Sequence, residues 1–252
     1  MSTIVYDVQD RICTITMNRP DSLNALNSEL INDLDAAVQQ AADDPAVKVV
    51  ILTGAGRGFC SGGDVRGANY VAADGEAAPV PRVTPPRGRA AYQLLHDMPK
   101  PTIAMINGPA AGAGIGLAGA CDLRIAAESA SFLAAFARWG LAGDYGATYY
   151  WPRILGLGQA RALFFLNEKL DARQALDQGI YHRVVPDAEL KATVDELAAR
   201  LAKTSSHGWA LMKNSLNFGE HAEITEALEN EQRNMARASQ ARAEGRAAAG
   251  KA

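Results

Sequence analysis

The sequence TGAGRGFCSGGD occupies positions 53–64, and NGPAAGAGIG occupies positions 107–116. The first follows the continuous, β-branched run 47–52, which is typical of a strand buried on both faces, and the second follows a predicted strand at 101–106. Glycine and alanine let a backbone approach a ligand closely, and turn–helix entries leave backbone N–H groups free to donate. These two stretches are therefore the candidate chemical segments of an α/β fold.

The flanking sequence supplies the strands and helices of such a fold. A strand–helix–strand order with short links indicates a crossover unit in an α/β sheet. The Pro-containing segment 69–89 is predicted to be a mobile loop, and nearly everything after Ala147 is predicted to be helical. The predicted elements are a hairpin of strands 2–6 and 12–17, a helix that Asn27 caps and Pro45 closes, a helix at 90–97, a strand at 122–126 and a last long helix at 220–248.

The composition excludes some partners. The 252 residues are 48% hydrophobic and 21% charged, with a formal net charge of −3. A nucleic-acid or acidic-membrane partner would need a large excess of Lys and Arg, so we expect neither. The N-terminus has no basic and apolar leader pattern, and no apolar run reaches membrane-spanning length. We therefore expect a cytoplasmic protein.

Neither a metal nor a redox cofactor is expected. The cysteines Cys13, Cys60 and Cys121 are widely spaced, without a CxxC pair, and are predicted to be small core residues. Residues 114–119 match the dinucleotide pattern GxGxxG by letter, but seven residues separate them from the preceding strand and no acidic residue lies about twenty positions beyond. The sequence therefore predicts no cofactor.

Taken in order, three motifs point to a family. NRPDSLNAL at 18–26, FCSGGD at 59–64, and ING at 106–108 with its Gly/Ala run ending in CDL at 121–123 resemble the enoyl-CoA hydratase/isomerase (crotonase) family over about residues 3–215. The resemblance implies a crotonase-like spiral of ββα units in residues 1–200. It also implies a helical C-terminal region, 201–252, that packs in a homotrimer or in a hexamer formed as a dimer of trimers.

The resemblance also implies a substrate and a set of binding residues. The substrate is an acyl-CoA thioester, whose oxygen is held between the backbone N–H groups of Gly63 and Ala113, a pair called an oxyanion hole. Each such donor is typically worth roughly 3–4 kcal/mol. Phe136 and Trp139 are predicted to border the acyl group. The residues expected around CoA are Ser22, Leu23, Ser61, Arg66 and Lys213.

The acid–base residues distinguish the family's reactions. By resemblance, hydratases place two glutamates where this chain has Gly116 and Phe136, so an ordinary hydratase mechanism is doubtful. Asp144 aligns with the aspartate that moves a proton in family isomerases. It also aligns with the nucleophile of aromatic-acyl-CoA dehalogenases, but their histidine base looks replaced by Arg89 and their tryptophan by Phe136. Dehalogenation is thus disfavoured.

Asp144 carries the functional prediction. A single carboxylate suits a 1,3-proton shift, so we predict an enoyl-CoA isomerase. Phe136, Trp139 and Trp151 would bury the carboxyl if they line the pocket. Asp144 also precedes a predicted helix and could instead be its N-cap. The alternatives are a hydratase with a non-standard residue set and a non-catalytic protein that binds CoA thioesters.

Overall fold

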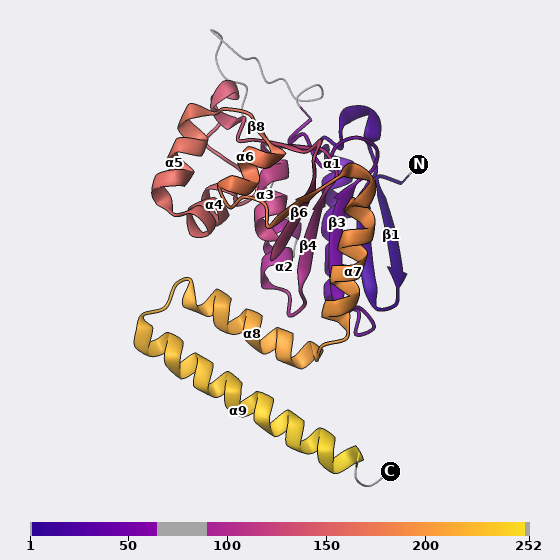
Figure 1. Ribbon diagram of the computed structural model, residues 1–252, viewed down its shortest axis with the longest axis vertical. Helices are drawn as coiled ribbons and strands as arrows, with labels where there is room; N and C mark the ends of the chain where they lie inside the picture. Colours follow the sequence, from indigo (N-terminus) through magenta and orange to yellow (C-terminus); the bar gives the residue numbers. More distant parts are fainter. Residues whose placement is uncertain (1, 65–89, 250–252) are drawn as a thin grey trace.

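A computed structural model describes residues 2–64 and 90–249 of the chain. In this part the central sheet has the strand order β1-β2-β3-β4-β6-β9, in which β1 and β2 form an antiparallel hairpin and the later pairs are parallel (Figure 1). The bounds of its strands are Ile4–Gln9 (β1), Ile12–Met17 (β2), Val49–Gly54 (β3), Thr102–Ile106 (β4), Leu123–Ala127 (β6) and Arg183–Val185 (β9).

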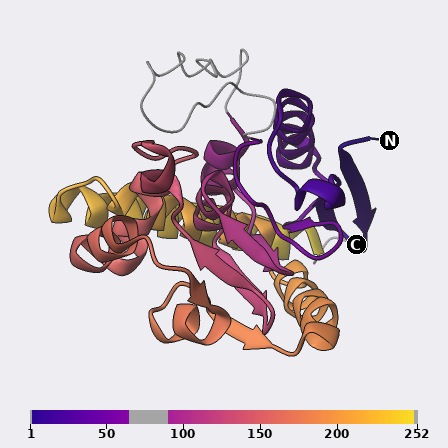
Figure 2. The same ribbon diagram turned by 90° about the horizontal axis from the view of Figure 1, so that it is seen from above.

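Helices cover both faces of this sheet, as the view from above shows (Figure 2). Alternate residues of each strand point to opposite faces. Val50 and Leu52 of β3 therefore belong to the larger core with α1 (Ser28–Asp43), α2 (Ala91–Asp97) and α3 (Ala113–Ala120). Val49 and Ile51 pack instead in a second core with α7 (Leu190–Ala202). Both cores bury β3, as the continuous apolar run predicts.

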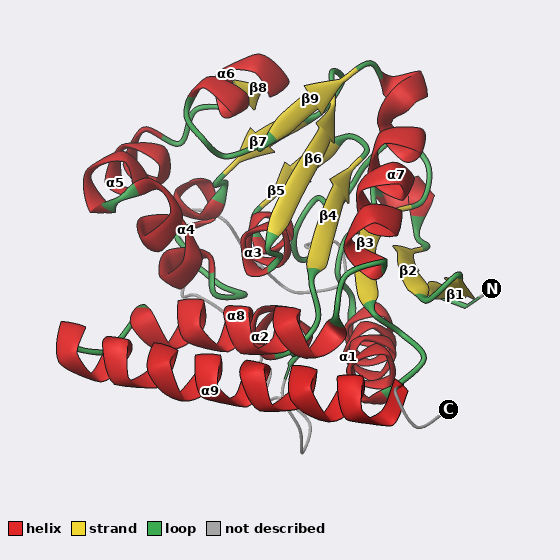
Figure 3. Cartoon of the chain, turned by 60° about the horizontal axis from the view of Figure 1, so that its bottom comes forward, coloured by secondary structure: helices red, strands yellow, loops and turns green. Residues whose placement is uncertain are grey.

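A smaller sheet lies beside the first and consists of β5 (Pro109–Ala111), β7 (Ser131–Leu133) and β8 (Leu170–Asp171). β5 pairs parallel to β7, and β7 pairs antiparallel to β8. Three short helices lie on this side of the molecule (Figure 3): α4 (Ala147–Leu155), α5 (Leu157–Leu166) and α6 (Ala172–Asp177). The described chain also has the 3-10 turns η1 (Pro20–Ser22), between β2 and α1, η2 (Phe136–Trp139), between β7 and α4, and η3 (Asp187–Glu189), directly before α7.

The last two helices form a separate layer below the sheet. α8 (Ser206–Gly219) lies next to the body and packs against α9 (Ile224–Ala249), which runs along the outer side of α8 (Figures 1 and 3). The prediction of a long C-terminal helix is confirmed, with a start at Ile224 rather than at 220.

Most of the predicted elements are present with small shifts of their ends. Asn27 caps α1 through a hydrogen bond from Leu30 N to Asn27 Oδ1 (2.9 Å). The segment after Ala147 departs from expectation, because β8 and β9 interrupt its helices. The predicted mobile loop at 69–89 lies outside the described residues. Within the described part, no helix is both long and apolar enough to cross a membrane.

Candidate active site

The site begins where β3 and β4 end. These strands are parallel neighbours, with Leu52 opposite Ala104, so the chain leaves both at the same edge of the sheet. The pairing resumes beyond the strands, where Cys60 and Ala110 form a parallel bridge and Ala111 N donates to Cys60 O (2.9 Å). The two glycine-rich segments therefore run side by side, as a shared site requires.

A third segment, residues 22–26, holds the first glycine-rich loop from its other side. Leu26 N donates to Gly62 O (2.8 Å), and Asp64 N donates to Leu26 O (2.9 Å). Asn24, which is fully buried, donates from Nδ2 to Gly58 O (2.8 Å). Asn24 and the Asn107 side chain, which donates to Gly54 O (2.8 Å), explain why asparagines recur in the motifs. Their amides fix the backbone and are not aimed at a ligand.

Two glycines in left-handed conformations bring the loops into contact. Gly62 has a φ of 96° and Gly112 a φ of 52°, where residues with a Cβ are rare. A Cβ added at Gly62 would lie 3.0 Å from Ala111 O and 3.5 Å from Ala113 N. Gly63 and Ala113 therefore sit on adjoining backbone segments, and both line the same cavity.

The amides of Gly63 and Ala113 meet a basic requirement for an oxyanion hole. Among the described residues, neither N–H donates to a backbone acceptor. Ala113 is the first residue of α3, a position whose N–H has no partner inside the helix. Free, preorganised donors of this kind stabilise negative charge on an oxygen bound between them.

The cavity itself has a volume of about 250 Å³. Its walls come from the two glycine-rich loops, from the 22–26 segment and from residues 135–144. Phe136 is largely buried and stacks on Phe164, with ring centroids 6.1 Å apart, whereas Trp139 is 44% exposed at the rim. The lining residues are Ser22, Ala25, Ser61, Gly62, Gly63, Asp64, Gly112, Ala113, Ala135, Phe136, Trp139, Leu141 and Asp144.

Asp144 lines this cavity but differs from expectation in two ways. Its side chain is exposed, and Trp151 is fully buried elsewhere, donating from Nε1 to Ile115 O (3.1 Å). Asp144 is also not the N-cap of α4, which is Gly146. Instead, Asp144 Oδ1 accepts a hydrogen bond from Tyr145 N (2.7 Å). The cap interpretation is therefore wrong, because two further residues separate the aspartate from the first helical residue.

The segment that carries Asp144 packs closely on α3. A Cβ added at Gly116 would overlap the Tyr145 carbonyl oxygen and would lie 2.7 Å from Tyr145 Cβ. Tyr145 is buried and has a φ of 52°. Burial, and then the nearby Asp144 carboxylate, raise the pKa of Tyr145 well above its ordinary value, so its phenol stays neutral beside the aspartate.

The cysteine beside the cavity carries no charge. Cys60, Cys13 and Cys121 are all buried free thiols, as predicted. Burial raises the pKa of the Cys60 thiol to about 12. A neutral sulfur next to the glycine-rich loops does not offset the positive potential of the free N–H groups, as a thiolate would.

The predicted CoA ligands divide into three groups. Ser22 and Ser61 line the cavity, and the Ser61 hydroxyl donates to Ser22 O (3.0 Å), whereas Leu23 packs behind, with Leu23 O accepting from Ser61 N (3.0 Å). Arg66 lies outside the described residues, as does Arg89, the residue in the place of the dehalogenase base. Lys213, on α8, is not brought to this cavity.

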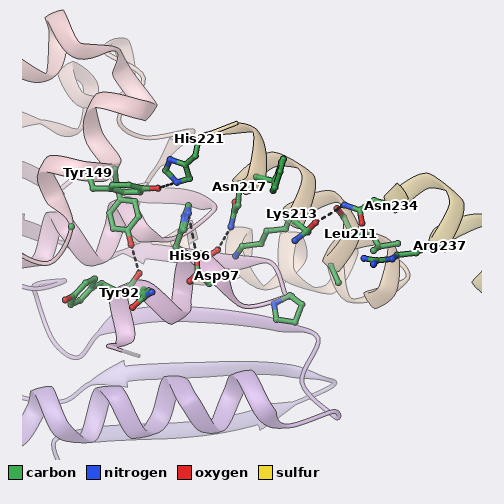
Figure 4. Close-up of a pocket in the computed structure, with 17 residues that line it drawn as sticks. Tyr92, His96, Asp97, Tyr149, Leu211, Lys213, Asn217, His221, Asn234 and Arg237 are labelled. Atoms are coloured by element: carbon green, nitrogen blue, oxygen red, sulfur yellow. Dashed lines mark hydrogen bonds and ion pairs between the residues drawn. The ribbon is translucent and has the colours of Figure 1, made fainter. Parts of the chain in front are cut away.

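Lys213 borders a different cavity of about 850 Å³, between α2, α4 and the α8–α9 layer (Figure 4). Its buried ammonium donates to Leu95 O (2.9 Å), Lys100 O (3.2 Å) and Asp122 Oδ2 (2.8 Å). A lysine has only three N–H donors, and all of them are used. These contacts fit a role in holding α8 to the body and give no support to the prediction that Lys213 binds CoA, which stays a prediction.

Sequence reasoning missed some lining residues. Ala25, Ala135 and Leu141 carry no chemical signal, since small or apolar residues occur throughout the chain. Asp64 did carry a chemical signal, because it is a charged residue in the motif 59–64, and the motif 18–26 contains the opposite charge of Arg19. Arg19 Nη2 and Asp64 Oδ2 form an ion pair at 2.9 Å, which joins those motifs at the cavity wall.

Comparisons with known proteins identify the family. The family model described as enoyl-CoA hydratase/isomerase matches residues 7–249. The 1,2-epoxyphenylacetyl-CoA isomerase of Escherichia coli K12 is 38% identical over 220 residues, covering 87% of this chain and 84% of the relative. A 4-chlorobenzoyl coenzyme A dehalogenase of Arthrobacter sp. is 32% identical, covering 90% and 82%. The short-chain-enoyl-CoA hydratase of Clostridium acetobutylicum is 30% identical, covering 90% and 86%.

Solved structures show the same architecture. The crystal structure of an enoyl-CoA hydratase subunit I from Geobacillus kaustophilus HTA426 superposes with a TM-score of 0.85 at 29% identity. The match covers 98% of this chain and 94% of the solved one. The likeness therefore extends over both sheets and the C-terminal helices.

Proposed function

The chain belongs to the enoyl-CoA hydratase/isomerase family, and from this premise we propose that it is an enoyl-CoA isomerase in which Asp144 moves the proton. The main support is the composition of the cavity wall. Among the described lining residues the carboxylates are Asp64 and Asp144. Asp64 is paired with Arg19, so Asp144 is the better candidate for proton transfer.

The position of Gly116 favours isomerisation over hydration. By resemblance, a hydratase would carry a glutamate at this place. Here even a Cβ would overlap the Tyr145 carbonyl oxygen, so a longer side chain requires a displaced backbone. The second such place holds Phe136, whose ring stacks on Phe164. With neither glutamate, the usual means of activating a water molecule is missing.

The proposed reaction balances with one carboxylate. The thioester oxygen accepts hydrogen bonds from the N–H groups of Gly63 and Ala113. Asp144 removes a proton from Cα or Cγ of the enoyl group, and the electron pair delocalises onto the thioester oxygen as a dienolate. The same proton returns from Asp144 to the other end of the dienolate, so the double bond moves by one position without gain or loss of atoms.

The proposal is tested by giving purified protein 3-enoyl-CoA and 2-enoyl-CoA in separate assays. We expect isomerisation of the first without hydration of the second. Asp144→Asn removes the base and should lower the isomerisation rate by about 10²–10⁴-fold, while the affinity for a saturated acyl-CoA changes little. Asp177→Asn, an equal substitution at an exposed site paired with Arg173, is the control and should keep full activity.

Other outcomes point to the alternatives. Hydration of 2-enoyl-CoA would support a hydratase with a non-standard residue set. Binding of acyl-CoA without turnover would support a non-catalytic binder. An unchanged isomerisation rate in Asp144→Asn would contradict the role of this carboxylate.

A further inference from the structure

The segment that presents Asp144 has an unusual backbone. Within residues 140–146, the residues Gly140, Gly143, Tyr145 and Gly146 all have positive φ, between 52° and 125°. Tyr145 is the only one of these four with a side chain, and left-handed conformations are uncommon for bulky residues. A strained residue persists where its surroundings determine it, and such residues cluster at functional sites.

The surroundings that determine this conformation are specific contacts. On one side, the Tyr145 carbonyl and Cβ lie against the open surface of α3 at Gly116. On the other side, the Tyr145 ring packs against that of Tyr92, with centroids 5.1 Å apart. The Tyr92 carbonyl in turn accepts a hydrogen bond from Tyr150 Oη (2.8 Å). Tyr145 is thus held between α3 and α2.

One hydrogen bond links the packing of Tyr145 to the residue that lines the cavity. Tyr145 N donates to Asp144 Oδ1 (2.7 Å), so the place of the Tyr145 backbone fixes the direction of the adjacent carboxylate. Asp144 lines the cavity, whereas neither Gly116 nor Tyr145 does. These two residues can therefore influence the aspartate without touching a bound molecule.

We propose that Gly116 and Tyr145 are positioning residues for the proton-transfer step. Because Gly116 has no side chain, the Tyr145 backbone packs directly on α3. This contact, through the hydrogen bond from Tyr145 N to Asp144 Oδ1, orients the Asp144 carboxylate toward the cavity. This inference rests on the proposed role of Asp144. Gly116 therefore has a role beyond the loss of a glutamate. Because it has no Cβ, the Tyr145 backbone can pack on α3 in the position that orients Asp144, the carboxylate proposed to transfer the proton.

The decisive variant is Gly116→Ala. The added methyl group must push the Tyr145 backbone away, which turns the Asp144 carboxylate. A misplacement of about 1 Å can cost a catalysed reaction about 10²-fold. We therefore expect kcat for 3-enoyl-CoA isomerisation to fall by about 10²-fold. KM and the Kd for butyryl-CoA should change less than about threefold, since the amides of Gly63 and Ala113 remain in place.

A control variant separates positioning from general damage to α3. Gly119→Ala adds the same methyl group three residues later on α3, where it would meet Tyr150 Cβ at 3.1 Å rather than the Asp144 segment. It should retain kcat within about threefold, and both variants should keep the circular-dichroism spectrum of the parent.

A crystal structure of Gly116→Ala gives a readout that does not depend on turnover. We expect the Asp144 carboxylate to be displaced from its parent position by about 1 Å or more, with α3 otherwise unchanged. An undisplaced carboxylate, or a kcat equal to that of the parent, would overturn the positioning role. A parent enzyme without isomerase activity would refute the proposed function instead, and the displacement would still decide the role of Gly116.

Discussion

The proposed role of a backbone N–H group in catalysis can be tested directly at Ala113. It is the first residue of α3, and it lines the cavity. The first helical position tolerates proline, because its N–H has no partner within the helix. Ala113→Pro therefore removes the donor with limited damage to α3. Loss of one oxyanion-hole donor typically lowers kcat by about 10²–10³-fold, and we expect that decrease here.

Ala113→Gly is the matched control, because it retains the N–H and removes only the methyl group. It should keep kcat within about threefold. The infrared C=O stretch of a bound thioester provides a second measurement, since hydrogen bonds to the oxygen lower its frequency. Ala113→Pro should reduce that shift. A normal shift with normal turnover would show that this amide does not contact the substrate.

The sequence predicted the two glycine-rich loops better than it predicted the surroundings of Asp144. The glycine-rich stretches demand close backbone approach, and Gly62 and Gly112 show it through their positive φ values. The setting of Asp144 depends instead on Tyr145, whose residue type gives no sign of its positive φ. Its conformation is imposed by α3, which no local pattern near 145 encodes.

At the scale of elements, strands β1 to β4 and β6 of the main sheet were predictable because each has a β-rich run of five or six residues, whereas the three-residue strand β9 was missed. β3 packs into cores on both faces and so reads as a continuous hydrophobic run. The second sheet was not predictable, because β5 and β8 have only three and two residues. Strands of that length show no periodicity.

α8 is fastened to the body through a buried ammonium. Lys213→Met removes hydrogen bonds to two backbone carbonyls and to Asp122, which also accepts from Thr102 N (2.7 Å) and so keeps a partner. Hydrogen bonds that involve a charged group contribute about 1.5–3 kcal/mol. We expect Lys213→Met to lower the free energy of unfolding by about that amount, as measured by urea denaturation.

The matched control is Lys191→Met. Lys191 is exposed on α7 and pairs with Asp195 four residues later (2.6 Å), an arrangement worth about 0.3–0.5 kcal/mol. The affinity for CoA and acyl-CoA should be unchanged in Lys213→Met. A large loss of affinity with normal stability would support the prediction that this lysine contacts CoA.

At the scale of the molecule, the α8–α9 layer has a surface on which no other described part of the chain packs. α9 lies on the outer side of α8, away from the sheet (Figure 1). Ile224, Leu228 and Met235 on α9 are 70%, 51% and 64% exposed. Their spacing of four and seven residues places them on one stripe of the helix. A helix gains most of its stability from packing such a stripe, so a single chain leaves α9 incompletely supported.

We therefore expect this layer to pack against other copies of the chain, in the trimer implied by the family resemblance. Light scattering coupled to size exclusion should give a mass about three times, or six times, the 26.7 kDa of one chain. The double variant Leu228→Asp/Met235→Asp places charge on the apolar stripe and should shift the protein toward monomers. Gln232→Asp adds charge at an exposed polar position of α9 and should leave the mass unchanged. An intact trimer in the double variant would place the subunit contact elsewhere on the molecule.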